Sequence, residues 1–153
     1  MVDKGLIFLA KSNRYSVLKS NQTSINGIGK IVYSDGTDLS YGDPAEIFGV
    51  LNIENEFYDF INSALTKGSF TRQYYGFLFG PYFDYDSGEI KDSEVGMIYA
   101  GVENKIPKKD FFELCLLLCN AKLNGMDIIE DNEAKKEDIL QFKFEIEERL
   151  KTL

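Results

Sequence analysis

The chain contains no histidine among its 153 residues. Histidine is the side chain that proteins use most often as a general base and as a metal ligand, so a serine or cysteine nucleophile here would depend on lysine or a carboxylate for activation. The Gly-x-Ser-x-Gly, P-loop and dinucleotide-binding motifs are also absent, because Gly27-Ile28-Gly29 lacks the third glycine and a following helix. We therefore predict that the protein is not an enzyme, with no catalytic residue and no cofactor.

Cysteine is scarce as well, with Cys115 and Cys119 the only two in the chain. They lie four residues apart in a strongly helical stretch, which places them on one helical face, where a disulfide would strain the helix. Two thiols without any histidine also make a poor tetrahedral zinc site. We expect two buried, reduced thiols, which suit a reducing cytoplasm.

A calcium site is excluded by the order of residues after Asp84. The run Asp84-x-Asp86-x-Gly88 begins like an EF-hand loop, which needs an oxygen ligand at its fifth position, glycine at its sixth and glutamate at its twelfth. Those positions hold Gly88, Glu89 and Val95. The pattern therefore predicts an acidic hairpin turn, within a hairpin over 82–89, and no metal site.

Long apolar runs are missing too. The segment from Leu6 to Ala10 is too short for the core of a signal peptide, and the run from Leu114 to Cys119 falls far below the roughly 20 residues that span a bilayer. We predict a soluble, cytoplasmic protein.

Basic residues are nearly absent from the middle of the chain. Between Ile31 and Ile90 there are ten carboxylates against Lys67 and Arg72, a formal charge of −8 that equals the net charge of the whole protein. The same window holds fourteen of the 21 aromatic residues. With a sequence pI near 4.6, nucleic acid and anionic membrane would be repelled, whereas a basic protein would be attracted.

Five phenylalanines in this window, at positions 48, 57, 60, 77 and 79, are expected in the core. The remaining tyrosines and carboxylates come from three segments, 35–46, 54–59 and 82–89. Tyrosine is enriched at protein interfaces, which favours a partner-binding surface over incidental acidity. The predicted surface consists of Asp35, Asp38, Tyr41, Asp43, Glu46, Glu54, Glu56, Tyr58, Asp59, Tyr82, Asp84, Tyr85, Asp86 and Glu89.

Periodicity and turn residues predict the elements of the first half. Segments 5–11 and 14–20 are expected to form a hairpin, and 27–34 a third strand. Asp43 caps a short helix that Gly49 should end, with Pro44 at its first position and Glu46 completing a capping box. A second helix begins at Asn52 and ends before Gly68, where a left-handed cap is expected.

In the second half, 69–80 is predicted as one strand with a possible bulge at Gly76, followed by a turn at 84–88 and a strand over 95–103. A buried helix is expected over 107–123. For the last segment, charge pairing favours a helix, although residues 139–147 also alternate as a strand would. In a helix, Leu140 and Phe144 lie off the apolar stripe and are available to a neighbouring element or to a second subunit, as in a homodimer.

These elements predict a single α+β domain over 1–153, an antiparallel sheet of about five strands with three to four helices packed on one face. The leading functional hypothesis is a small acidic inhibitor, such as a bacterial immunity protein or a phage counter-defence protein that neutralises a basic nuclease toxin or effector by occupying its basic site. The alternative is a binder of a small molecule or nucleotide signal, or a small enzyme, with a Tyr-rich pocket walled by 69–80. A small cationic ligand would use aromatic faces and acids together.

Overall fold

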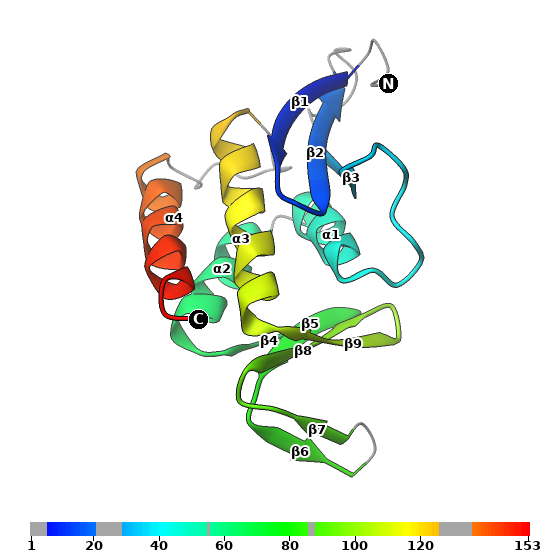
Figure 1. Cartoon of the computed structure of the whole chain (residues 1–153), viewed down its shortest axis with the longest axis vertical. Coiled ribbons are helices and arrows are strands. Elements are labelled where there is room, and N and C mark those ends of the chain that lie inside the picture. The colour runs from blue at the N-terminus through cyan, green and yellow to red at the C-terminus, as the bar shows by residue number, and fades with distance from the viewer. Residues whose placement is uncertain (1–5, 21–28, 55, 86–87, 126–135) are drawn as a thin grey trace.

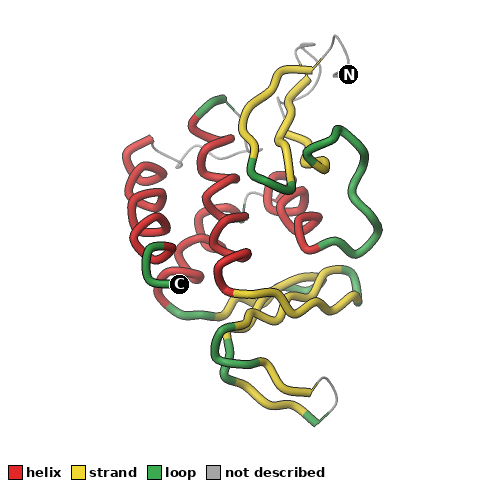
Figure 2. Tube along the Cα trace, in the orientation of Figure 1, coloured by secondary structure: helices red, strands yellow, loops and turns green. Residues whose placement is uncertain are grey.

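Residues 6–20, 29–54, 56–85, 88–125 and 136–153 are the part of the chain that this computed structural model describes. Within them the chain forms four α-helices, one short 3-10 turn and nine strands, and every strand pair is antiparallel. The predicted α+β class is therefore confirmed. The strands divide among three sheets (Figures 1 and 2).

The first sheet has the order β1-β2-β3, with β1 at Leu6–Lys11, β2 at Tyr15–Ser20 and β3 at Gly29–Tyr33. The predicted hairpin between β1 and β2 is confirmed, and the N–H of Ser12 donates to the carbonyl of Tyr15 at 2.8 Å to close it. The pairing shifts register between Phe8 and Ala10, which bends β1 as a bulge does.

The first two helices differ from the prediction at their junction. The 3-10 turn η2 (Pro44–Glu46) continues into α1 (Ile47–Glu54), so Gly49 lies inside a helix and does not end it. The expected cap at Asn52 is wrong, because that residue belongs to α1 and α2 (Phe57–Thr66) begins after Glu56. The expected end is confirmed: Gly68 has a φ of +72°, and its N–H donates to the Ser63 carbonyl at 2.9 Å.

The second sheet has the order β4-β5-β8-β9, with strands at Ser69–Thr71, Tyr75–Phe79, Glu94–Tyr99 and Val102–Pro107. The predictions of single strands over 69–80 and 95–103 are both wrong, because each segment folds back on itself. The first turns after Thr71, where the N–H of Arg72 donates to the Tyr75 carbonyl at 2.9 Å. The second turns at Ala100 and Gly101, both at positive φ, as in a type I′ hairpin.

A two-stranded ribbon extends from the second sheet between β5 and β8. It consists of β6 (Tyr82–Asp84) and β7 (Gly88–Ile90), paired in register from Tyr82 with Ile90 to Asp84 with Gly88. Figure 1 shows this ribbon at the bottom of the molecule, on the side of the sheet away from the helices. This pairing confirms the hairpin that the sequence predicts over 82–89, although the lengths of its two strands were not predicted.

The last two helices are α3 (Lys108–Leu123) and α4 (Lys136–Leu150). The helix over 107–123 is confirmed, and residues 139–147 are helical. On α4, Ile139 and Ile146 are buried, whereas Leu140 and Phe144 are exposed, as the stripe predicted. A second copy of the chain at those two side chains stays a prediction.

The core lies between the second sheet and the helices above it. The ring of Phe77 on β5 is 5.0 Å from that of Phe60 on α2 and 4.9 Å from that of Phe111 on α3. At the far end of α3, the amide of Asn124 donates to the Leu9 carbonyl at 2.7 Å and so connects α3 to the first sheet. None of the helices in the described ranges has the length and apolarity that a membrane crossing requires.

Candidate functional site

The exposed part of the first predicted segment contacts its own chain. The carboxylate of Asp35 accepts hydrogen bonds from the N–H and hydroxyl of Thr37 at 3.0 and 2.6 Å, which lower the pKa of the Asp35 carboxyl. Asp38 pairs with Lys30 at 2.9 Å, and both side chains are largely exposed. Tyr41 is 81% exposed. Of these residues, only Tyr41 presents a large apolar contact area.

Asp43 is a structural residue. Its carboxylate accepts the hydroxyls of Tyr15 and Tyr33 at 2.9 and 2.8 Å and also the N–H of Ala45 at 2.9 Å, which caps η2. Burial, the hydrogen bond to Asp43 and the charge of Asp43 raise the pKa of Tyr15. The predicted cap at Asp43 is confirmed, but the capping box is not formed: the carboxylate of Glu46 accepts the N–H of Gly42 at 2.9 Å, and the N–H of Asp43 donates to the Ser40 carbonyl at 3.0 Å. Asp43 therefore holds the start of η2 to the first sheet, and Glu46 holds it to the loop that precedes it.

In the second predicted segment, two of the three carboxylates pair with a basic residue of the same chain. The guanidinium of Arg72 lies 2.9 Å from Glu56 and 3.3 Å from Asp59, and the hydrogen bond to Glu56 raises the pKa of Arg72. Tyr58 donates its hydroxyl to Asp138 at 3.2 Å and packs its ring against Phe142. The side chain of Glu54 lies outside the described residues.

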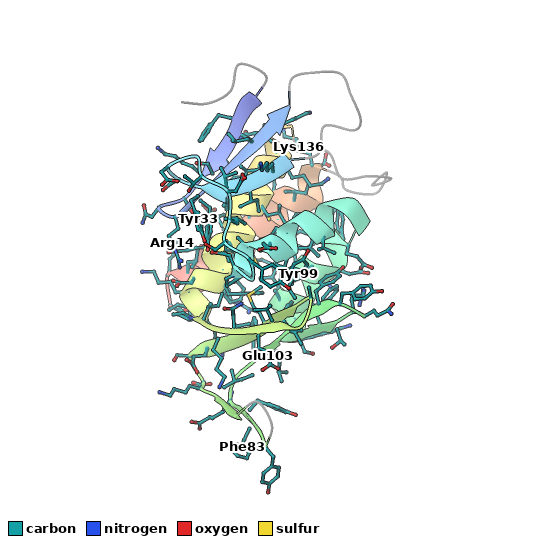
Figure 3. The ribbon with its side chains drawn as sticks, turned by 90° about the vertical axis from the view of Figure 1, so that its right-hand side faces the viewer. Arg14, Tyr33, Phe83, Tyr99, Glu103 and Lys136 are labelled. Carbon is teal, nitrogen blue, oxygen red and sulfur yellow. The ribbon has the colours of Figure 1, made fainter. Side chains whose placement is uncertain are left out.

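The third predicted segment is the β6–β7 ribbon, and it presents aromatic rings to solvent. Tyr85 is 96% exposed and Phe83 63% exposed, with their ring centroids 5.5 Å apart. Tyr82 is also exposed, as is Glu89. The Asp84 side chain and all of Asp86 lie outside the described residues. Figure 3 shows Phe83 at the end of the molecule farthest from the first sheet.

Phe83 is not among the surface residues that the sequence predicts, because phenylalanine is usually a core residue. The available signal was its position between the chain-breaking pair Gly80-Pro81 and the acidic turn that follows it. No lysine or arginine occurs from 73 to 90, and this stretch includes three carboxylates. The ribbon therefore combines exposed aromatic area with negative charge.

The three segments do not meet on one surface. The loop that carries Tyr41 lies beside the first sheet and α1, whereas the ribbon lies beyond the second sheet (Figure 1). Internal partners also occupy most of the carboxylates in the first two segments. Among the predicted residues, those of the ribbon form the candidate surface, which we call the ribbon surface: Tyr82, Phe83, Tyr85 and Glu89 as described, with the acidic residues at 84 and 86 in its sequence.

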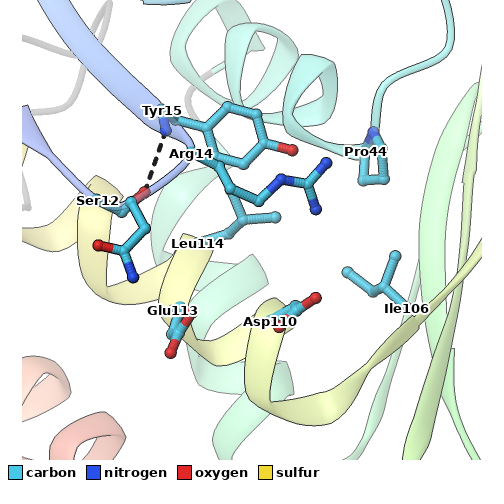
Figure 4. Close-up of a pocket in the computed structure, with 9 residues that line it drawn as sticks. Ser12, Arg14, Tyr15, Pro44, Ile106, Asp110, Glu113 and Leu114 are labelled. Atoms are coloured by element: carbon cyan, nitrogen blue, oxygen red, sulfur yellow. Dashed lines mark hydrogen bonds between the residues drawn. The ribbon is translucent and has the colours of Figure 1, made fainter. Parts of the chain in front are cut away.

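Two hollows are described in the fold. One, of about 270 Å³, lies on the face of the second sheet that turns toward the ribbon, and we call it the sheet groove. The other, shown in Figure 4, lies between the β1–β2 turn and α3, beside Arg14, Asp110 and Glu113, and has a volume of about 40 Å³. Because pockets for small molecules commonly measure about 300 to 1,000 Å³, this second hollow is far smaller than a typical metabolite site.

The two thiols are buried and unpaired with each other as a disulfide, as expected. Burial raises the pKa of Cys115 well above its usual range and that of Cys119 to about 12, so both are neutral thiols that are poor nucleophiles. In the part of the chain that the structure describes, no three Cys, Asp or Glu side chains are grouped to hold a metal ion.

No protein-family model, curated protein or solved structure matches the chain. Chemically, the ribbon surface offers aromatic contact area and negative charge, and the groove beside it offers an apolar floor with charged groups at its edges.

Proposed function

We propose that the chain is a small acidic inhibitor that binds a basic protein. A bacterial immunity protein that neutralises a basic nuclease toxin, or a phage counter-defence protein directed at a basic effector, is the class that fits these properties. In such a complex the carboxylates occupy the groove where the partner expects phosphate, and exposed aromatic rings provide the buried anchors.

The observation that carries this proposal is the ribbon surface. Exposed Phe and Tyr side chains at the end of a projecting ribbon bury a large area at low cost in side-chain entropy, which is why such residues are enriched among binding hot spots. Phe83 and Tyr85 already contact each other, so part of the anchor is ordered before the partner arrives. The net charge of −8 attracts a basic partner over a distance of about one Debye length.

The experiment that tests the proposal compares two tyrosines that are similarly exposed. Three proteins are immobilised: the unmodified chain, Tyr85→Ala and Tyr41→Ala. Each is used to capture proteins from an extract of the native cell, and each is also tested for binding to the purified product of the gene directly upstream. Tyr85→Ala is expected to weaken binding of a basic protein by at least tenfold, which is the usual size of a hot-spot loss. Tyr41→Ala, whose ring is 81% exposed on the loop, is expected to bind like the unmodified chain.

Three results decide the matter. Inhibition of the captured protein's activity at a one-to-one ratio supports the inhibitor role. Loss of binding with Tyr41→Ala but not with Tyr85→Ala overturns the assignment of the contact to the ribbon. Capture of acidic proteins only, with no basic partner, overturns the proposal as a whole.

A further inference from the structure

The sheet groove is formed by an alternation of glycine and aliphatic residues on one face of the second sheet. Across β5, β8 and β9, the register places Gly76 opposite Ile98 and Ile98 opposite Glu103. Two residues further along β5, Leu78 lies opposite Gly96, which lies opposite Lys105. Since side chains alternate between the two faces of a strand, all of these residues share the face away from the helices. The glycines leave hollows, and the aliphatic side chains make the floor apolar.

The ribbon closes one side of this groove. Ile90 of β7 packs over Gly96, because a Cβ on that glycine would lie 2.6 Å from the Ile90 Cδ1. Tyr82 of β6 also lines the groove and remains partly exposed there. The ammonium of Lys105 reaches the ribbon at Gly88, where a Cβ would lie 3.4 Å from its Nζ. Lys105 therefore places its charge at the end of the groove near the ribbon.

At the end of the sheet groove away from the ribbon, the charge is negative. Arg72 lines the groove, but its guanidinium is already neutralised by Glu56 and Asp59 at 2.9 and 3.3 Å. Glu103 is exposed, and the structure gives it no ion pair with any residue that it describes. Figure 3 shows Glu103 below the second sheet, on the side of the ribbon. Next to it lies Ile98, which is 41% exposed.

We infer that the sheet groove binds a basic side chain of the partner, with its alkyl stem on Leu78 and Ile98 and its cation at the carboxylate of Glu103, which lies opposite Ile98. Lysine and arginine combine an apolar stem with a charged end, which matches an apolar floor that ends at a carboxylate. The inference rests on the proposed function, because it takes the partner to be basic.

Anions and neutral rings fit the groove less well. An anion at the Ile98 end of the groove would face the exposed carboxylate of Glu103, which has no ion pair among the described residues, within a molecule of net charge −8. A neutral ring would cover that carboxylate and remove water from it without providing a partner, which is costly. Tyr82 belongs to both the groove and the ribbon surface, so one basic partner can contact both at the same time.

A direct test uses the isotope-labelled protein and a probe that imitates the side chain. We expect n-butylguanidinium to cause saturable NMR shifts at the Ile98 methyl groups and at the Gly76 and Gly96 amides. Glu103→Gln is expected to weaken this binding about fivefold, the upper range for an exposed ion pair. Glu145→Gln, which removes an exposed carboxylate from α4, an element that does not line the groove, is the matched control and should leave the affinity unchanged.

Two further probes can overturn the inference. If 1-pentanol or butanesulfonate binds at the same amides as tightly as n-butylguanidinium, the groove does not select a cation. Shifts that are spread over the surface without saturation at the groove would overturn it as well.

The outcome for the groove can be separated from the outcome for the inhibitor role. If the probe binds the groove but no basic protein is captured, the site stands and the inhibitor proposal fails. If a basic protein is captured and binds Glu103→Gln and Ile98→Ala as tightly as the unmodified chain, the inhibitor proposal stands and the groove inference fails.

Discussion

Asp43 shows how a carboxylate that the sequence assigns to a surface can be a structural residue. Its role as a cap is visible in the run Asp43-Pro44, because capping depends on neighbours in the chain. Its hydrogen bonds to Tyr15 and Tyr33 cannot be predicted from the sequence. Those tyrosines lie 28 and 10 residues away and come close to Asp43 only once the first sheet has formed. Local counts of charge therefore overstate the number of acids available to a partner.

Replacing Asp43 should destabilise the fold. Asp43→Ala removes the cap of η2 and leaves two tyrosine hydroxyls without their charged acceptor, and we expect a loss of about 3 kcal/mol in the free energy of unfolding. Urea unfolding followed by circular dichroism measures it. Asp38→Ala, which removes an exposed ion pair from the same loop, should cost about 0.5 kcal/mol or less. Equal shifts of the two urea midpoints would contradict the structural role of Asp43.

The buried thiols predict a loss of stability at alkaline pH. Burial raises their pKa in the folded state above the ordinary value of 9.0, so the folded chain keeps protons that the unfolded chain releases. This stabilisation is complete below pH 9 and is lost as the pH rises toward the folded-state pKa, by about 1.4 kcal/mol per pH unit for each thiol.

The variant Cys119→Ala tests this assignment, with urea unfolding measured from pH 8 to pH 10. The fall in unfolding free energy at the alkaline end should be shallower than in the unmodified chain, because one fewer thiol ionises on unfolding. Parallel curves would mean that the folded-state pKa of Cys119 is not raised.

At the scale of elements, the helices were more predictable than the strands. The helix over 107–123 was predicted from a continuous apolar pattern, and its observed bounds are close to it. Segments 69–80 and 95–103 were each predicted as one strand but each contains parts of two, because the turn at 72–74 has no glycine or proline and the turn at 100–101 has a single glycine. At Ala100 the chain adopts a φ of 51° that alanine does not favour, so nothing in that residue indicates a turn. The division of the strands into three sheets follows from those turns, so it could not be predicted from the sequence either.

Two glycines of the second sheet should respond differently to the same substitution. A Cβ on Gly76 would lie 2.3 Å from the backbone oxygen of Phe70, so Gly76→Ala must separate β4 from β5, at a cost of about 3 kcal/mol. A Cβ on Gly96 would meet only the end of the Ile90 side chain, which can rotate, so Gly96→Ala should cost about 1 kcal/mol. Thermal unfolding of both variants measures the difference, and the reverse order would contradict the described register.

The β8–β9 turn offers a stabilising substitution. Asparagine adopts positive φ more readily than alanine, and Asn-Gly is the preferred pair in type I′ turns. Ala100→Asn should therefore raise the free energy of unfolding by about 0.5 to 1 kcal/mol. Ala100→Val, which is β-branched and strongly disfavours positive φ, should lower it. An unchanged midpoint in both variants would mean that this turn does not constrain the sheet.

At the scale of the whole molecule, the candidate site was predictable only in part. The sequence correctly placed the tyrosines and acids of 82–89 together, because a short turn keeps neighbours in the chain close in space. The sequence could not show that Glu56 and Asp59 are unavailable to a partner. Their ion pairs with Arg72 form only because β4 folds against α2. The sequence also gave no indication of the groove, which exists only once residues from four strands and the ribbon are assembled.

The net charge of −8 predicts how the rate of association depends on salt. Attraction between exposed charges is screened over about 10 Å at 0.1 M salt and about 3 Å at 1 M. We expect the association rate constant with a basic partner to fall at least tenfold between 0.02 M and 0.5 M sodium chloride, whereas the dissociation rate constant changes little. Stopped-flow mixing measures both. An association rate that is independent of salt would exclude electrostatic steering.

The way the ribbon joins the sheet has a consequence for how binding specificity can change over generations. β5 and β8 pair directly, from Tyr75 with Tyr99 to Phe79 with Val95, and the N–H of Gly80 donates to the Glu94 carbonyl at 2.9 Å just beyond that pairing. Residues 81–93 are thus an excursion whose two ends already lie side by side. Substitution of exposed side chains such as Phe83 and Tyr85 leaves the pairing beneath them intact, provided that buried Ile90 and the Ser93 carbonyl, which accepts the N–H of Lys108, are retained. Such a scaffold can acquire a new recognition ribbon while retaining the same core.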